Sequence, residues 1–181
     1  MISYLKRTWE FTKNLGTTGA FTETSEYVVD AISKQVNPNK QQVIIEYGAG
    51  YGNITRGLLA KMNENSVLYA FEVNLSFCET LRQIGDKRLI VIPLSASEVD
   101  KYLTKSESVD CIISSIPFSF IPNGVLDEIL QKSHHLLKTN HYMTQVLYSR
   151  FQLKRYKRYF QNCKSRIVWN IPLAFIYESQ K

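Results

Sequence analysis

The chain has 181 residues, 44% of them hydrophobic and 21% charged, so its length and composition fit one globular domain with its own core. The formal net charge of +6 favours an anionic partner, either nucleic acid or an acidic membrane surface, without choosing between them. The sequence shows neither a run of roughly 20 apolar residues that would span a membrane nor the apolar core of a signal peptide. Three cysteines without paired spacing favour a reduced cytoplasmic setting and suggest no metal site.

Residues 2–15 contain no Gly or Pro and predict an amphipathic helix. A step of 100° per residue places Lys6, Arg7 and Lys13 on a polar arc, opposite a wider apolar arc that contains Trp9. This arrangement is typical of a helix in a membrane interface, but a helix that packs on the core of the domain has the same spacing. Both interpretations stay open.

A loop follows, and then a second predicted helix from Glu23 to Val36, with Thr22 or Thr24 as its N-cap. We therefore expect residues 1–37 to form a helical extension of the single domain 1–181.

A glycine-rich segment follows the first predicted strand. Three apolar residues, Val43–Ile45, form that strand, Glu46 closes it, and a helix is predicted over Asn53–Lys61. The turn between them consists of Gly48, Ala49, Gly50, Tyr51 and Gly52, which we call the glycine loop. Such a turn lets a ligand approach the backbone, and an acid beside it suits a cationic amino-acid end better than a pyrophosphate. The pattern resembles the first motif of S-adenosylmethionine-dependent methyltransferases, although a glycine-rich loop can also lack a ligand.

A second acid supports this interpretation. The apolar run Val67–Val73 predicts a strand that contains Glu72, which lies 20 residues beyond Gly52. This spacing predicts a carboxylate at the tip of the neighbouring strand, where it can accept hydrogen bonds from two ribose hydroxyls. A helix is predicted over Leu75–Ile84, with Gly85 just past its end.

The rest of the chain continues the alternation of strands and helices. After a strand over Arg88–Leu94, either Ser95 or Ser97 fits a contact with an adenine ring, and Ser97 equally fits the N-cap of a helix over Glu98–Leu103. The remaining predicted elements are the strand Val109–Ser115, a helix from about Gly124 to Leu137, the strand Tyr142–Tyr148, and two closing strands, Arg166–Trp169 and Ala174–Glu178.

This alternation predicts an α/β fold with a mostly parallel sheet and a terminal β-hairpin. The resemblance of the glycine loop to the methyltransferase motif implies the Rossmann-like, class I methyltransferase form of this fold, in which the sheet has seven strands and helices on both faces. Ligands in such folds bind at the carboxyl ends of the strands, and four polar residues are expected there: Glu46, Glu72, Ser95 and Ser115.

The segment Ser114-Ser115-Ile116-Pro117-Phe118, which we call the acceptor turn, resembles the Asn/Asp/Ser-x-Pro-Tyr/Phe motif of methyltransferases that act on planar amino groups. The resemblance implies that the Ser115 side chain and the Ile116 carbonyl accept hydrogen bonds from the amine. Pro117 would fix the turn, and Phe118 would wall the pocket. The ribosomal RNA adenine dimethylases have Asn-Leu-Pro-Tyr at this point.

The bacterial phospholipid N-methyltransferases are similar to this chain over more of its length, in Glu46–Gly52, Phe71–Cys78, Ser114–Phe118 and the tail Val168–Ala174. Where that family has Gly-Asp-Ala, this chain has Leu94-Ser95-Ala96. The resemblance implies S-adenosylmethionine as cofactor and membrane contact through the N-terminal helix. The cofactor-binding residues that it implies are Glu46, Gly48, Ala49, Gly50, Gly52, Glu72, Val73, Ser95, Ala96 and Ser114.

We therefore expect a cytoplasmic S-adenosylmethionine-dependent N-methyltransferase, peripheral on the inner face of the membrane, that methylates the amine of phosphatidylethanolamine-type phospholipids. The alternatives are an RNA (adenine N6) or small-molecule amine methyltransferase, or a non-catalytic cofactor-binding protein of the same fold. Ser115 or Tyr47 is the candidate acceptor for the proton of the amine. The basic and aromatic residues of 150–161 fit either a phosphate contact or a solvated helix face.

Overall fold

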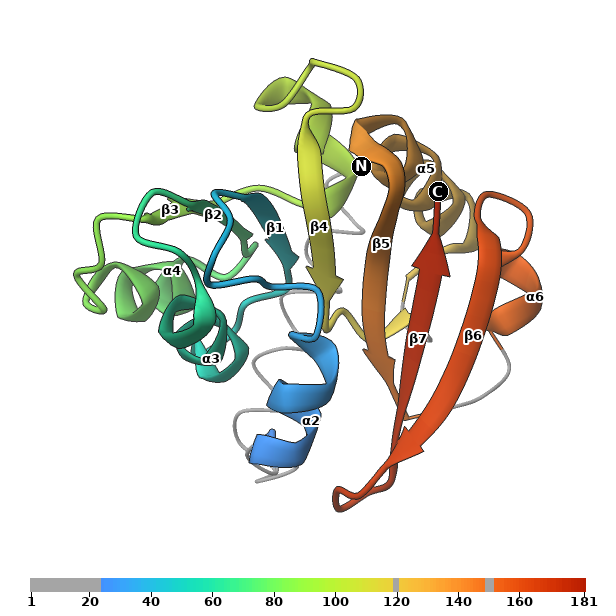
Figure 1. The fold of residues 1–181 in the computed structure, drawn as a ribbon, viewed down its shortest axis with the longest axis horizontal. Coiled ribbons are helices and arrows are strands. Elements are labelled where there is room, and N and C mark those ends of the chain that lie inside the picture. Colours follow the sequence, from blue (N-terminus) through green and yellow to red (C-terminus); the bar gives the residue numbers. More distant parts are fainter. Residues whose placement is uncertain (1–23, 119–120, 149–151) are drawn as a thin grey trace.

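The computed structural model describes residues 24–118, 121–148 and 152–181 (Figure 1). The predicted helix over 2–15 and the loop after it lie outside these residues. The elements in chain order are α2 (Glu26–Ile32), β1 (Val43–Tyr47), α3 (Asn53–Lys61), β2 (Val67–Phe71), α4 (Leu75–Arg82), β3 (Leu89–Ile92), the 3₁₀ helix η1 (Ala96–Lys101), β4 (Val109–Ser114), α5 (Asn123–Leu136), β5 (Leu137–Leu147), α6 (Leu153–Tyr156), β6 (Gln161–Val168) and β7 (Ala174–Gln180).

The seven strands form one sheet in the order β3-β2-β1-β4-β5-β7-β6. Neighbours from β3 to β5 are parallel, whereas β7 is antiparallel to both β5 and β6. The mostly parallel sheet with a terminal hairpin is therefore confirmed. The strand numbers fall from β3 to β1 and rise again from β4, so the chain changes its direction of progress across the sheet between β1 and β4. Folds of this kind bind ligands at that point.

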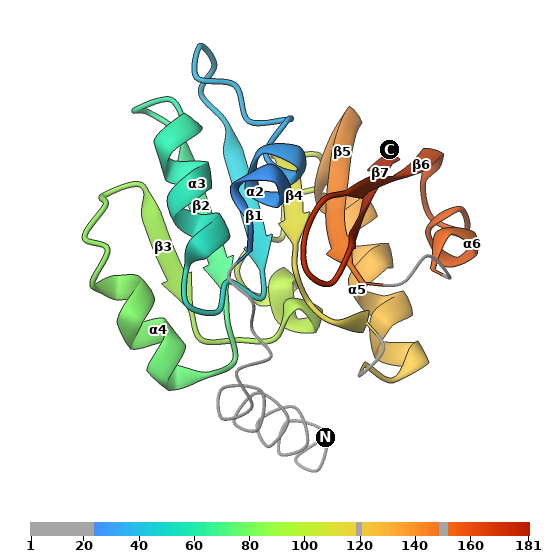
Figure 2. The same ribbon diagram turned by 90° about the horizontal axis from the view of Figure 1, so that it is seen from below.

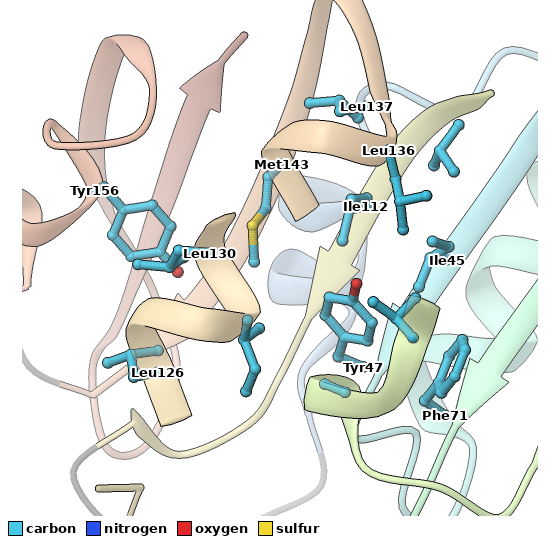
Figure 3. Packing of buried hydrophobic residues seen from close by; sticks show 14 of the residues in the cluster. Ile45, Tyr47, Phe71, Ile112, Leu126, Leu130, Leu136, Leu137, Met143 and Tyr156 are labelled. Carbon is cyan, nitrogen blue, oxygen red and sulfur yellow. The ribbon is translucent and has the colours of Figure 1, made fainter. Parts of the chain in front are cut away.

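Helices cover both faces of the sheet (Figures 1 and 2). Because side chains alternate along a strand, Ile44 faces a cluster built from α2 and α3, and Ile45 faces a larger cluster built from η1, α5 and α6. Figure 3 shows this larger cluster, with Tyr47, Ile112, Met143 and Tyr156 packed together. Among the described residues no helix is long and apolar enough to cross a membrane.

Two helices begin at other residues than predicted. α2 begins after Ser25 rather than after Thr22 or Thr24, and it ends at Ile32. The Ser33 hydroxyl donates to the Val29 carbonyl oxygen at 2.6 Å, and such a bond competes with continued helix. In η1 the N-cap is Ser95 and not Ser97, because the Ser95 side chain and Glu98 form a reciprocal capping box.

The last strands are longer than predicted. β5 begins at Leu137, directly after α5, because its first residues pair with Val109 and continue into the long pairing with β7. β6 begins at Gln161, five residues before the predicted start, because β7 offers partners over its whole length.

The basic and aromatic stretch after β5 is not one surface. In the described part, Tyr156 and Phe160 are buried in the core, whereas Lys154, Lys157 and Arg158 are exposed. The aromatic half of this stretch therefore serves packing, and the basic half faces solvent.

Candidate active site

The glycine loop turns the chain sharply between β1 and α3. Gly48, Gly50 and Gly52 have φ angles of +74°, +54° and +85°, in the left-handed region that favours glycine. At Gly48 a Cβ would also meet Ile116 Cγ1 at 3.0 Å, whereas at Gly50 a Cβ would meet nothing within 4 Å. The loop thus touches the acceptor turn on one side and leaves open space at Gly50.

Glu46 lies beneath this loop and is fully buried. Its Oε2 accepts a hydrogen bond from the Thr55 hydroxyl at 2.7 Å, and its Oε1 has no partner among the described residues. Burial raises the pKa of Glu46 to about 7, although the Thr55 hydrogen bond lowers it, and the nearby charge of Glu72 raises it further. A buried carboxylate oxygen without a donor is a place where a cationic group can bind.

Glu72 follows β2, whose residue Ala70 pairs with Glu46 in the neighbouring strand. Both of its carboxylate oxygens accept from backbone N–H groups, one from Gly50 at 2.9 Å and the other from Asn74 at 2.8 Å. Burial raises the pKa of Glu72, and these backbone hydrogen bonds work in the opposite direction. Glu72 thus fixes the shape of the glycine loop in addition to its predicted contact with ribose.

The acceptor turn is hydrogen-bonded directly to the glycine loop. The Ser115 hydroxyl donates to the Gly48 carbonyl oxygen at 2.7 Å, and the Ser115 N–H donates to the Tyr47 carbonyl oxygen at 3.0 Å. Ser114 is buried at the end of β4, where it pairs with Tyr47 of β1. The two predicted motifs therefore form a single unit at the carboxyl edge of the sheet.

A buried layer supports the acceptor turn from below. Gln145 of β5 donates from Nε2 to the Ile116 carbonyl oxygen at 3.0 Å. Phe118, only 2% exposed, stacks on Tyr156 with ring centroids 5.9 Å apart, and Tyr156 stacks on Tyr177. Pro117 is exposed, while Ser115 and Ile116 are half-buried. Phe118 therefore belongs to the core in this structure, and its predicted role as a pocket wall stays a prediction.

The predicted adenine contacts follow β3. The Ser95 hydroxyl accepts from the Ser97 N–H at 3.3 Å within the cap of η1, and Ala96 is 4% exposed. Val73 is half-buried beside Glu72. The contacts of these three residues with a cofactor stay predictions. The Ser95 hydroxyl already accepts a hydrogen bond as the N-cap of η1.

Tyr47 is not a proton acceptor for the substrate, contrary to the expectation. Its side chain is fully buried on the α5 face of the sheet, where its hydroxyl accepts from the Ser133 hydroxyl at 3.2 Å. Burial also raises the pKa of Tyr47 far above the physiological range. Figure 3 shows the ring among Ile45, Ile112 and Phe71.

Three supporting residues escaped the sequence analysis: Thr55, Asn74 and Gln145. Asn74 accepts from the N–H groups of Ser76 and Phe77 as the N-cap of α4, and an Asn just before a predicted helix was a readable signal. Gln145 was also detectable, as a long polar side chain next to Thr144 inside the predicted strand Tyr142–Tyr148. Thr55 gave no signal, because only the folded loop brings it to Glu46.

The residues of this edge fit the cationic amino-acid end of S-adenosylmethionine. The unpartnered Oε1 of Glu46 offers a buried acceptor, and the open space at Gly50 allows close approach to the backbone. Among the described residues no group of three or more His, Cys, Asp or Glu side chains is placed to hold a metal ion.

Comparison with known proteins points in the same direction. The family model of the ribosomal RNA adenine dimethylases matches residues 18–166. A methyltransferase of Oceanobacillus iheyensis is 25% identical over 109 residues, which are 60% of this chain and 48% of that protein. The ribosomal RNA small subunit methyltransferase A of Borreliella burgdorferi is 26% identical over 109 residues, 60% of this chain and 37% of that protein. The chain thus spans about half or less of the length of these curated relatives.

Solved structures share the fold at low sequence identity. The 1,6-didemethyltoxoflavin-N1-methyltransferase of Burkholderia thailandensis, solved with S-adenosylhomocysteine, has a TM-score of 0.74 and 14% identity, and the match covers 99% of this chain and 88% of that one. An rRNA methylase from Streptococcus thermophilus has a TM-score of 0.61 and 14% identity, with coverage of 84% and 93%. The fold is that of S-adenosylmethionine-dependent methyltransferases.

Proposed function

The chain belongs to the ribosomal RNA adenine dimethylase family, and from this premise we propose that it transfers methyl groups from S-adenosylmethionine to the amino group of an adenine base in RNA. One observation carries the proposal: the Ser115 hydroxyl donates to the Gly48 carbonyl oxygen at 2.7 Å. This bond holds the cofactor loop and the acceptor turn together, so that methyl donor and amine meet at one place. Such positioning supplies much of the catalysis of a displacement reaction.

The cofactor, when bound, supplies a methyl group on a cationic sulfur, which is a good leaving group. The free Oε1 of Glu46 would accept a hydrogen bond from the cationic amino group of the ligand. Glu72 holds the backbone of Gly50 by accepting from its N–H group. Because binding at Glu46 requires the ionised carboxylate, cofactor binding weakens as the pH falls below the Glu46 pKa of about 7.

The acceptor turn offers the amine only hydrogen-bond acceptors and no donors. The proton of the Ser115 hydroxyl is committed to Gly48, so the Ser115 oxygen presents only lone pairs to the substrate. The Ile116 carbonyl oxygen already accepts from Gln145 and keeps a second lone pair. Two such acceptors match the two N–H groups of a planar amine.

The protonation state of the amine favours an adenine base over a lipid headgroup as the methyl acceptor. The turn Ser114–Phe118 contains no ionisable side chain that would deprotonate an ammonium group. The amino group of adenine is neutral at physiological pH and needs no such step.

A phospholipid headgroup amine is the second candidate acceptor. The observation that favours it is an exposed, uncharged apolar segment, Trp169–Leu173, at the same edge of the molecule. An ammonium headgroup would lose its proton on transfer to a site of low dielectric, which lowers its pKa.

The test is methyl transfer from labelled S-adenosylmethionine by the full chain to two acceptors. The first is an RNA with unpaired adenines, and its matched control is the same RNA with N6,N6-dimethyladenine at those positions. The second is a vesicle of phosphatidylethanolamine and phosphatidylglycerol. We expect label in methyladenosine from the first RNA alone, and a rate of labelling about 10- to 100-fold lower in Ser115→Ala. Label in lipid alone would replace the RNA acceptor by the second candidate, and no label in either would refute the acceptor site.

A further inference from the structure

Large apolar side chains gather at the turn between β6 and β7. Trp169 is 69% exposed, Ile171 71% and Leu173 45%, and Pro172 between them is also exposed. We call residues 169–173 the hairpin tip. Contiguous exposed apolar side chains on a soluble protein are costly in water and mark sites of contact with another surface.

The hairpin tip has a defined shape. The Asn170 side chain, 5% exposed, donates from Nδ2 to the Pro172 carbonyl oxygen at 3.1 Å and accepts from the Ser25 N–H at 3.2 Å. The Ser25 hydroxyl donates to the Trp169 carbonyl oxygen at 3.2 Å. The polar groups of the tip thus face inward, to the start of α2, and its apolar side chains face out.

Strand register places the hairpin tip at the edge that carries the active site. Ser114 pairs with Gln145, and Gln145 pairs with Tyr177 of β7. From Tyr177 the strand runs three residues further to Ala174 before the tip begins, about 10 Å beyond the level of Ser114. Figure 1 shows the β6–β7 turn projecting past the ends of the parallel strands, beside α2.

The composition of the tip separates a lipid surface from RNA as its partner. The segment Ile167–Ala174 has no charged residue, so it offers no cation to a phosphate backbone. It presents an indole together with branched aliphatic side chains, which suit the boundary between headgroups and acyl chains. A positive net charge of +6 on the whole chain supports approach to an anionic surface.

The start of the described chain provides a second, independent argument. Ser25, which anchors the hairpin tip, lies ten residues after Leu15 in the sequence, and residues 2–15 have the basic and apolar arcs of a predicted amphipathic helix. If that helix is interfacial, as one of its two interpretations has it, a second segment suited to a lipid surface precedes the anchor of the hairpin tip in the sequence.

We propose that the hairpin tip docks the protein on an anionic phospholipid bilayer, with Trp169 and Ile171 inserted at the interface. The docked orientation turns the carboxyl edge of the sheet, and with it the active site, toward the membrane. This inference concerns where the enzyme works and does not depend on the methyl acceptor.

The test is co-sedimentation of the full chain with vesicles of phosphatidylethanolamine and phosphatidylglycerol, without cofactor. We compare the wild type with Trp169→Ala/Ile171→Ala and with a matched control, Ile90→Ala, an exposed apolar residue at the opposite edge of the sheet. The tip variant should lose about tenfold or more in vesicle partition, whereas the control should bind as the wild type does. Unchanged partition in the tip variant would overturn the proposal.

A second measurement reports on insertion itself. Trp9→Phe leaves Trp169 as the single tryptophan of the chain, so its emission shifts to shorter wavelength on vesicle addition if the tip enters the interface. No shift would overturn the docking proposal. A tip variant that loses RNA binding and keeps vesicle binding would overturn it too and would assign the tip to RNA. Cofactor binding is read separately by calorimetry, so failure of the docking proposal and failure of the methyltransferase proposal are distinguishable.

Discussion

The Ser115 hydroxyl and the Gly48 carbonyl oxygen lie 2.7 Å apart although 67 residues separate them in the chain. The bond joins the turn after β4 to the turn after β1. On the proposed function, the relative position of the amine and the methyl donor therefore depends on a side chain that would also contact the amine. Ser115→Ala should lower kcat about 10- to 100-fold, because an oriented acceptor and a positioning contact are lost together. Ser115→Thr keeps the hydroxyl and should retain most of the activity in the same steady-state assay. Equal activity of both variants would contradict this role.

Gly50 provides a test of the cofactor site that is separate from stability. Gly50→Ala and Gly85→Ala both place a Cβ at positive φ, with no atom closer than 4.0 Å, so each should cost about 1–2 kcal/mol in the free energy of unfolding. Only Gly50→Ala should weaken S-adenosylmethionine binding, because only Gly50 lies in the glycine loop. Thermal unfolding and titration calorimetry measure the two effects. Equal affinities of the two variants would place the cofactor elsewhere.

Glu46 predicts a pH dependence of stability. Its pKa is about 7 in the folded chain against 4.5 for an ordinary glutamate, so the folded state binds more protons than the unfolded state between these values. Stability from this group is therefore present at low pH and is lost as the pH rises from about 4.5 to 7. Glu46→Gln removes this loss, which should amount to roughly 1–3 kcal/mol at pH 8, and abolishes tight cofactor binding. Urea unfolding at pH 5 and pH 8 measures the free energy of unfolding of the wild type and of Glu46→Gln. The same change with pH in both proteins would contradict this prediction.

Thr55 affects the pKa of the Glu46 carboxylate. The Thr55 hydrogen bond lowers the Glu46 pKa, so Thr55→Val should raise it and move the pH midpoint of cofactor binding upward. Thr55→Ser keeps the hydroxyl and should leave the midpoint in place. Calorimetric titrations across the pH range 6–9 compare the three proteins, and a midpoint in Thr55→Val at or below that of the wild type would refute the assignment.

Gln145 is a positioning residue for the acceptor turn. Gln145→Leu removes the donor to the Ile116 carbonyl oxygen and should lower kcat about tenfold while cofactor affinity stays unchanged. Tyr156→Phe is the matched control, since it removes only a 3.5 Å contact to Gln145 and keeps the ring stack with Phe118. A kcat loss as large in Tyr156→Phe, or a weaker cofactor affinity in Gln145→Leu, would show a general structural role instead.

Local sequence patterns were sufficient to predict most of the fold and the place of the candidate site at the carboxyl edge of the sheet. The glycine loop, the spacing to Glu72 and the turn at Pro117 were readable, because each depends on a short run of residues that forces one backbone shape. α3 matched its predicted bounds, because a glycine precedes it and a polar segment follows it.

Long-range packing decided what the sequence could not predict. Tyr47 and Phe118 have residue types that suit a pocket, but their rings are buried against α5 and Tyr156. The early starts of β5 and β6 come from pairing with β7, which is distant in sequence. Thr55 reaches Glu46 only once the loop between them has folded.

The most direct test of the central claim is a crystal structure of the chain with S-adenosylhomocysteine. We expect the ligand over the glycine loop, with its ammonium group on Glu46 Oε1 and its sulfur facing Ser115 and Pro117. A ligand bound elsewhere, for example in the polar hollow formed by Gln35, Tyr142 and Lys164, would contradict it.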